Sequence, residues 1–183
     1  MTVLPLLPGA KPCKIGRMGE MVEIGTGENA LPVYQSTPGL DIKGGITANA
    51  KRCFDYLKGN AAVAGRIAVT GFSFGGTYAW SLAVHEPALK AAVPFYGHAN
   101  FSVDEFHHIG CPVLAFYGER DTRLIEKLPE VEVSLQEAGI SFDSVIYPNA
   151  GHAFFNRNPK AYNEAAATDA WNRSLAFLDR HLN

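Results

Sequence analysis

The sequence predicts an α/β domain with a mostly parallel sheet of about six strands and helices on both faces. From residue 66 onwards, continuous apolar and β-branched runs alternate with segments of helical periodicity. This alternation is typical of a parallel sheet covered by helices. The chain has 183 residues, of which 47% are hydrophobic and 19% charged. That is enough for one buried core and too little for two, so we expect a single domain over residues 1–183.

The first part of the chain precedes that alternation. Residues 1–20 are rich in proline, glycine and lysine and show neither a period of two nor one of 3.6, so we expect an extended lead-in. The runs MVEIG and LPVYQST, separated by turn-forming residues, predict a short hairpin. The apolar spacing from Ile46 to Leu57 then predicts a helix that ends at Gly59.

Strands and helices follow in turn over the rest of the chain. The predicted strands are RIAVTGF, KAAVPFYG, CPVLAFYG and SFDSVIYP. The predicted helices are GGTYAWSLAVHE, LIEKLPEVEVSLQEAG and the segment from about Pro159 to Leu182. Together with the hairpin, these elements give about six strands, all parallel apart from the hairpin.

A serine sits among glycines where the first of these strands turns into a helix, in VTGFSFGG. The spacing Gly71-x-Ser73-x-Gly75 is that of a nucleophile elbow, a tight strand-turn-helix that exposes the serine. We expect side chains at Gly71 and Gly75 to collide with the crowded backbone. The turn would place Ser73 at a helix start, where the N–H of Phe74 is the expected donor to an oxyanion. The five-residue pattern by itself is also found in ordinary loops.

An acid and a base follow the elbow in the order that the elbow requires. Asp121 comes directly after the strand CPVLAFYG, in GERD, and His152 comes after SFDSVIYP, in NAGH. A triad on this kind of sheet runs serine, acid, histidine, each at the carboxyl end of a strand. The sequence therefore predicts Ser73 as nucleophile, His152 as general base and Asp121 as the acid that orients it.

Four further residues are predicted to bind substrate. His98 directly follows the strand VPFYG, on the same rim as the predicted triad. Phe72, Tyr96 and Phe154 are bulky rings close to the triad residues in the sequence, and they would leave limited room around the nucleophile. We therefore expect a preference for short acyl chains.

No metal or cofactor is predicted. His107 and His108 are adjacent, so a regular element cannot turn both toward one metal ion, and no neighbouring residues complete a ligand set. The histidines near helix ends, His85 and His181, are more simply explained by the favourable position of a cation at a helix carboxyl end. The chemistry expected of a triad needs no cofactor.

Charge and cysteine content limit the partners and the compartment. The net charge of −2 gives no electrostatic basis for binding nucleic acid or an anionic membrane, which leaves small molecules or protein partners. A small-molecule ester is the partner that the predicted triad implies. No segment approaches the length of a membrane span, and the amino terminus does not resemble a secretory signal. Cys13, Cys53 and Cys111 are widely spaced and odd in number, which favours reduced thiols in a cytoplasmic protein.

These motifs resemble those of the dienelactone hydrolase family of α/β-hydrolases. The resemblance runs through RIAVTGFSFGG, FYGERD, NAGHAFFN and the closing YNEAAATDAWNRSLAFLDRHL, and covers most of residues 45–182. It implies a reduced α/β-hydrolase fold with Ser73 as nucleophile, Asp121 as acid and His152 as base.

One departure from the family pattern bears on function. Members of the dienelactone type often carry cysteine at the nucleophile position, whereas this chain has Ser73, as a general carboxylesterase does. We therefore expect hydrolysis of small esters through an acyl-enzyme. The alternatives are a dienelactone-type lactone hydrolase, an acyltransferase or peptidase with the same triad, and a non-catalytic binding module.

A second departure is a gap. The hydrolase fold normally has a strand, a helix and another strand between the opening hairpin and the helix before the elbow, and here only PGLDIKGG fills that space. The loop that usually supplies the second oxyanion N–H would be lost with this unit. Since an uncovered sheet edge favours pairing with another chain, we expect a homodimer. In the alternative, the lead-in packs on its own chain and the hairpin closes the gap.

Overall fold

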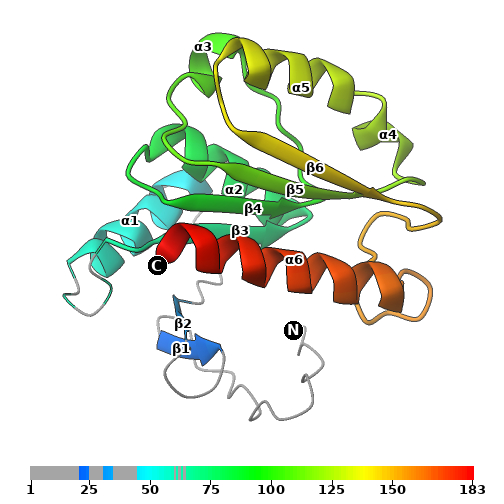
Figure 1. Ribbon diagram of the computed structural model, residues 1–183, viewed down its shortest axis with the longest axis horizontal. Coiled ribbons are helices and arrows are strands. Elements are labelled where there is room, and N and C mark those ends of the chain that lie inside the picture. The colour runs from blue at the N-terminus through cyan, green and yellow to red at the C-terminus, as the bar shows by residue number, and fades with distance from the viewer. Residues whose placement is uncertain (1–20, 25–30, 35–44, 60, 62, 64) are drawn as a thin grey trace. The chain divides into compact units, whose positions relative to one another are not determined.

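The computed structural model describes residues 21–24, 31–34, 45–59, 61, 63 and 65–183 (Figure 1). The chain divides into two units, residues 1–64 and 65–183. The expected single domain therefore stays a prediction. The expected lead-in, residues 1–20, lies outside the described residues, as does PGLDIKGG apart from its last glycine.

The first unit contains the predicted hairpin and helix. Strands β1 (Met21–Ile24) and β2 (Leu31–Tyr34) pair antiparallel, with Met21 opposite Tyr34. Helix α1 (Ile46–Lys58) ends at Gly59, which occupies its C-cap. Both predictions from the local pattern are confirmed.

The second unit is built on four parallel strands. They are β3 (Ala68–Phe72), β4 (Ala91–Phe95), β5 (Val113–Gly118) and β6 (Phe142–Tyr147), and their order across the sheet follows the chain. The expected sheet of about six strands is wrong for the described residues, because β1 and β2 form a separate two-stranded sheet. The two strands of a hairpin pair with each other across a local turn, so the sequence pattern does not reveal whether the hairpin joins a larger sheet.

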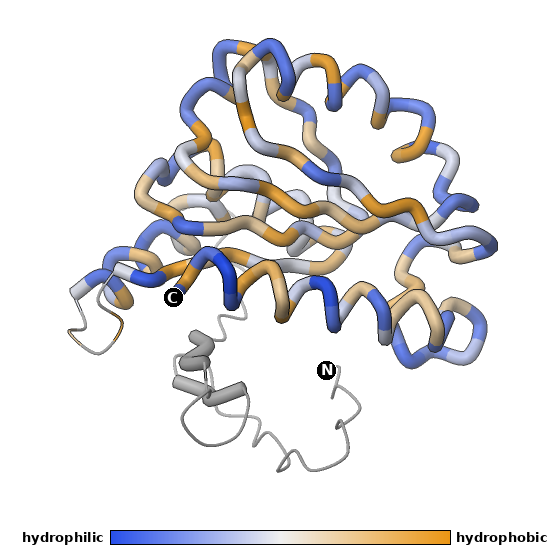
Figure 2. Tube along the Cα trace, in the orientation of Figure 1, coloured by the Kyte–Doolittle hydropathy of each residue, from blue (hydrophilic) through white to orange (hydrophobic). Residues whose placement is uncertain are grey.

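The two middle strands form the core of this unit. Every residue of β4 and β5 is buried, whereas β3 and β6 are only partly buried. This explains why the middle strands are continuously apolar, since both of their faces are covered. In Figure 2 the hydrophobic colouring is concentrated along these strands, while α6 alternates between polar and apolar positions.

Helices cover both faces of the sheet, as predicted. Figure 1 shows α6 (Glu164–Leu182) across one face, with α3 (Val103–Phe106), α4 (Thr122–Ile125) and α5 (Leu128–Glu137) on the other. Helix α2 (Phe74–His85) shares the face of α3, because its Trp80 ring lies 6.1 Å from Phe106 of α3. None of the described helices has the length and apolar content needed to cross a membrane.

The observed helices differ in three places from those that the sequence predicts. The helix expected over LIEKLPEVEVSLQEAG is two helices, α4 and α5, with Pro129 in the first turn of α5, where its missing N–H costs nothing. Helix α3 was not expected, although Ser102 and Glu105 form a capping box at its start. Helix α6 begins later than Pro159 because Asn163 caps it, its side-chain oxygen accepting from the N–H of Ala166 at 3.1 Å.

We predict that Trp80→Ala destabilises this fold strongly. Trp80 has no solvent exposure and its ring lies 5.7 Å from Phe142 of β6 as well as against α3. Truncation would leave a cavity between three elements, at a cost of about 3–5 kcal/mol. Urea unfolding measures the loss.

The matched control is Val133→Ala, since Val133 is an exposed apolar residue of α5. It should change the free energy of unfolding by no more than about 0.5 kcal/mol. Equal effects of the two substitutions would contradict the packing role of Trp80.

Candidate active site

Ser73 stands in the turn between β3 and α2, in a conformation that is unusual for a residue with a side chain. Its φ is 53° and its ψ is −113°. Two hydrogen bonds hold it there: its N–H donates to the carbonyl of Phe95 at 3.0 Å, and its carbonyl accepts from the N–H of Thr77 at 3.0 Å. A non-glycine residue with positive φ is strained and persists only where its surroundings impose it. The turn expected at Ser73 is therefore present.

The glycines around Ser73 do not all serve the purpose that the spacing suggests. A Cβ at Gly71 would lie 2.1 Å from the carbonyl oxygen of Gly75, which confirms the expected collision there. The collision expected at Gly75 is wrong, because a Cβ there would meet only open space. The crowded position is Gly76, where a Cβ would lie 2.4 Å from the Phe95 carbonyl oxygen. The lack of a side chain at Gly76 thus lets the first turn of α2 approach the end of β4.

The three residues of the predicted triad are connected by hydrogen bonds. The Ser73 Oγ lies 2.7 Å from the Nε2 of His152, and the His152 Nδ1 is hydrogen-bonded to the Oδ2 of Asp121. A carboxylate beside Nδ1 favours the tautomer with the proton on Nδ1. The lone pair of Nε2 then faces the serine hydroxyl, so the arrangement can remove the serine proton.

Asp121 is buried at the start of α4, and its carboxylate is directed at His152. Asp121 is 5% exposed, whereas the side chain of His152 is 37% exposed. Asp121 is the N-cap residue of α4, yet its side chain makes no capping hydrogen bond. Aspartate at this position usually caps the helix. Here the carboxylate is instead committed to the imidazole, which supplies the partner that a buried charge needs.

Tyr96 lies behind His152 and is also held in an unusual backbone conformation. Its φ is 37° and its ring centroid lies 5.1 Å from that of His152. Tyr96 is 3% exposed, and this burial raises the pKa of its hydroxyl, an effect partly offset by the hydrogen bond from the Phe155 backbone. A raised pKa keeps the hydroxyl protonated at neutral pH. Tyr96 therefore supports the imidazole and does not act as a base.

The structure separates the four predicted substrate-binding residues into two pairs. Tyr96 and Phe154 are buried, and the Phe154 ring, 0% exposed, lies 5.2 Å from both Tyr96 and Tyr147. Phe72 is half-buried, and His98 is exposed, with its N–H donating to the Oγ1 of Thr77 at 3.0 Å. Of the four, Phe72 and His98 are therefore the ones that solvent reaches.

Phe74 follows the serine as the first residue of α2. Its N–H has no acceptor within the helix, because the residue one turn earlier, whose carbonyl would accept it, lies before the helix begins. This N–H is therefore free to donate to a bound group beside Ser73. The Phe74 side chain is 62% exposed, and its ring lies 4.8 Å from that of Tyr78.

Several contributors to the site were not found from the sequence. Gly97 is one, since a Cβ there would lie 2.2 Å from the carbonyl carbon of Gly76. The left-handed backbones of Tyr96, Asn149 and Ala153 are others, with φ of 37°, 60° and 61°. Asparagine in a turn is a signal for such a conformation, whereas tyrosine and alanine give none.

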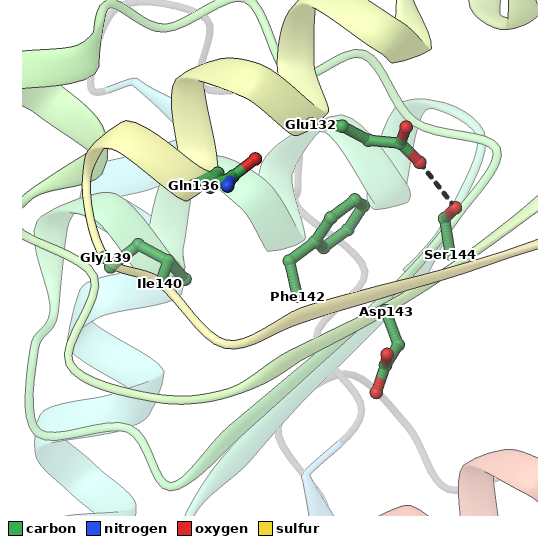
Figure 3. A pocket seen from close by; sticks show the side chains of 7 residues that line it. All are labelled: Glu132, Gln136, Gly139, Ile140, Phe142, Asp143 and Ser144. Atoms are coloured by element: carbon green, nitrogen blue, oxygen red, sulfur yellow. Dashed lines mark hydrogen bonds between the residues drawn. The ribbon is translucent and has the colours of Figure 1, made fainter.

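A hollow lies away from these residues, in the described part of the chain. Figure 3 shows a cavity of about 390 Å³ between α5 and the start of β6, where the hydroxyl of Ser144 donates to the carboxylate of Glu132 at 2.9 Å. The triad residues follow the carboxyl ends of the strands, so this cavity is at the opposite end of β6. The described residues also contain no group of three histidine, cysteine or acidic side chains that could hold a metal ion.

Comparison with known families decides the relationship. A model of the dienelactone hydrolase family matches residues 39–182. The chain belongs to this family. The elbow, Ser73, Asp121 and His152 all lie within the matched part.

Individual relatives agree with this assignment. A Salmonella typhimurium protein named "Putative carboxymethylenebutenolidase" is 33% identical over 146 residues, which cover 74% of this chain and 54% of that protein. A Bradyrhizobium protein named "Probable 2-oxo-3-(5-oxofuran-2-ylidene)propanoate lactonase" is 36% identical over 139 residues, covering 69% and 56%. The chain spans about half the length of the curated relatives it matches.

Solved structures share the fold. The crystal structure of a "Putative Dienelactone Hydrolase from Klebsiella pneumoniae" is 31% identical, with a TM-score of 0.64, and the match covers 73% of this chain and 60% of that one. Dienelactone hydrolase from Anabaena variabilis is 23% identical with a TM-score of 0.61 over 75% and 60% of the two chains.

We predict that Gly76→Ala and Gly75→Ala differ sharply, although the residues are adjacent. The added methyl group at Gly76 would meet the Phe95 carbonyl and should destabilise the fold by about 1–3 kcal/mol. The same change at Gly75 meets open space and replaces a helical glycine by alanine, which should leave stability unchanged or raise it by up to about 1 kcal/mol. Urea unfolding of both variants compares them, and equal losses would refute the assignment of the close approach to Gly76.

Proposed function

We propose that the protein is a serine carboxylesterase that hydrolyses small, short-acyl esters through an acyl-enzyme. The observation that carries the proposal is the hydrogen-bonded chain from Ser73 through His152 to Asp121, with the serine held on a strained turn at a helix start. This arrangement fits nucleophilic catalysis of acyl transfer. Membership of a family of lactone and ester hydrolases supports the same chemistry.

Acylation follows from the positions of the atoms. The Nε2 of His152 accepts the proton of Ser73 as its Oγ attacks the ester carbonyl carbon. The negative charge that develops on the carbonyl oxygen lies beside the free N–H of Phe74. Asp121 stabilises the imidazolium, which then gives its proton to the departing alcohol as the carbon–oxygen bond breaks.

Deacylation repeats these steps with water. His152 takes a proton from a water molecule, whose oxygen attacks the acyl carbon and forms the second tetrahedral intermediate. Collapse of this intermediate releases the carboxylic acid, and the proton returns from His152 to Ser73.

Substrate contact is assigned to His98, which is exposed, and to Phe72, which is half-buried and packs on Phe95. Tyr96 and Phe154 form the fixed wall behind His152. A wall of closely packed rings does not open to receive a long chain, because packed cores resist insertion. Short acyl groups are therefore the proposed substrates.

A lactone hydrolase is the second candidate, favoured by the names of the relatives. The same triad opens a lactone, except that the leaving alkoxide stays attached to the acyl group. The two candidates share every catalytic step. They differ only in the substrate that the site accepts.

The decisive test is turnover of chromogenic esters of increasing acyl length, together with simple lactones, by the wild type and by Ser73→Ala. We expect acetyl and butyryl esters to react faster than long-chain esters, and Ser73→Ala to lose at least about 10³-fold in kcat. Ser134→Ala is the matched control, because Ser134 lies on α5. Better turnover of long-chain esters would refute the short-acyl preference. Activity that survives Ser73→Ala would favour the non-catalytic binding module, because the turnover would then not come from Ser73.

We also propose that the protein is a homodimer. Among the described strands β3 pairs only with β4, so its other edge, next to Ser73, has no strand partner among the described residues. A closed two-fold contact is the commonest way to cover such an edge.

Sedimentation at micromolar concentration tests this proposal. We expect a species of twice the 19.8 kDa chain mass. A monomer with full esterase activity would refute it.

A further inference from the structure

The acid and the base of the triad stand on two different loops. Asp121 ends the loop that follows β5, and His152 lies within the loop that follows β6. The length of the His152–Asp121 hydrogen bond therefore depends on how these two loops are held against each other. A base that must reach within about 3 Å of its proton donor tolerates little movement.

The backbones of the two loops are joined directly. The N–H of Glu119 donates to the carbonyl of Tyr147 at 3.0 Å, and the N–H of Arg120 donates to the carbonyl of Ala150 at 2.9 Å. Gly118 allows this approach, since a Cβ there would lie 2.5 Å from the carbonyl oxygen of Gly151. The two loops are thus joined at several backbone positions shortly before Asp121 and His152.

Side chains add a second connection above the first. The carboxylate of Glu119 accepts from the N–H of Asn149 at 2.8 Å, and the guanidinium of Arg120 donates to the side-chain oxygen of Asn149 at 3.1 Å. Asn149 has a φ of 60°, a conformation that asparagine tolerates better than most residues. The three residues form a clamp across the loops, which we call the Glu119–Arg120–Asn149 clamp.

All three clamp residues are exposed. Exposed polar pairs contribute little to overall stability, because solvent screens them and ordering long side chains costs entropy. Their effect must then be local. The clamp joins the residue two positions before Asp121 to the residue three positions before His152, close enough to set the separation of the acid and the base.

We propose that Glu119, Arg120 and Asn149 are positioning residues for the triad. The proposal rests on the proposed function of the same site. The clamp holds the His152 loop on the Asp121 loop so that Nδ1 stays bonded to the carboxylate and Nε2 stays within reach of Ser73. Loss of the clamp lowers kcat by misplacing the base, and leaves KM unchanged because no clamp residue is assigned to substrate contact.

Three variants test the clamp. Glu119→Ala removes the acceptor, Glu119→Gln keeps an acceptor oxygen, and Asn149→Gly removes the amide while allowing the left-handed backbone. Glu126→Ala is the matched control, since Glu126 is an exposed glutamate at the end of α4, outside both loops. Urea unfolding confirms that each variant is folded before its kinetics are compared.

For Glu119→Ala and Asn149→Gly we expect kcat to fall about 10-fold or more with KM unchanged within about 2-fold. Glu119→Gln should recover most of kcat, and Glu126→Ala should match the wild type. An unchanged kcat, or a loss of kcat that Glu119→Gln does not reduce, would overturn the proposal.

A measurement without substrate separates this proposal from the proposed function. The Nδ1 proton that His152 shares with Asp121 should give a downfield proton resonance in the wild type, assigned by its absence in His152→Gln. We expect this resonance to broaden or disappear in Glu119→Ala and Asn149→Gly and to persist in Glu126→Ala. If no ester or lactone is turned over, a clamp-dependent resonance supports the clamp and refutes the esterase, whereas a resonance insensitive to both variants overturns the clamp.

Discussion

The left-handed backbone of Ser73 is the constraint on which the rest of the site depends. A turn with a φ of 53° directs the chain from β3 straight into α2, leaving the serine hydroxyl at the top of the sheet and the Phe74 N–H beside it. The turn is possible because Gly71 and Gly76 admit two carbonyl oxygens that any side chain would exclude. Its strain, of about 1–3 kcal/mol, must be offset by contacts elsewhere. Because the Ser73 N–H donates to the carbonyl of Phe95, contacts made by β4 must supply part of this compensation.

The order of the strands then determines what lies between Ser73 and His152. Ser73 follows β3, Asp121 follows β5 and His152 follows β6, so the His152 loop must cross the ends of β5 and β4 to reach the serine. Tyr96 stands at the end of β4, and the imidazole lies against its ring at 5.1 Å between centroids. The left-handed conformation of Tyr96 is therefore understandable as the way in which β4 ends without blocking this path.

Sequence reasoning succeeded where the cause is local or follows chain order. Apolar runs predicted β3 to β6, and the position of Asp121 and His152 after successive strands was enough to bring them to one edge. It failed where the cause is a contact between distant segments. The choice between Gly75 and Gly76 depends on how closely α2 approaches β4, and no spacing encodes that distance. Phe154 likewise follows the triad histidine closely, yet which side of the loop its ring faces is decided by Tyr96 and Tyr147.

The aromatic residues beneath the site connect stability to catalysis. Phe72, Phe95 and Phe116 occupy neighbouring positions on β3, β4 and β5, with ring centroids 4.5 Å and 4.8 Å apart along the row. Phe95 is at once the centre of this row and the residue whose carbonyl holds Ser73. Because packed aromatic rings resist displacement, the row keeps that carbonyl fixed while the backbone above it remains strained. A smaller residue at position 95 would loosen the acceptor of the Ser73 N–H together with the core, so the rigidity of the core is part of what keeps the nucleophile aligned with His152.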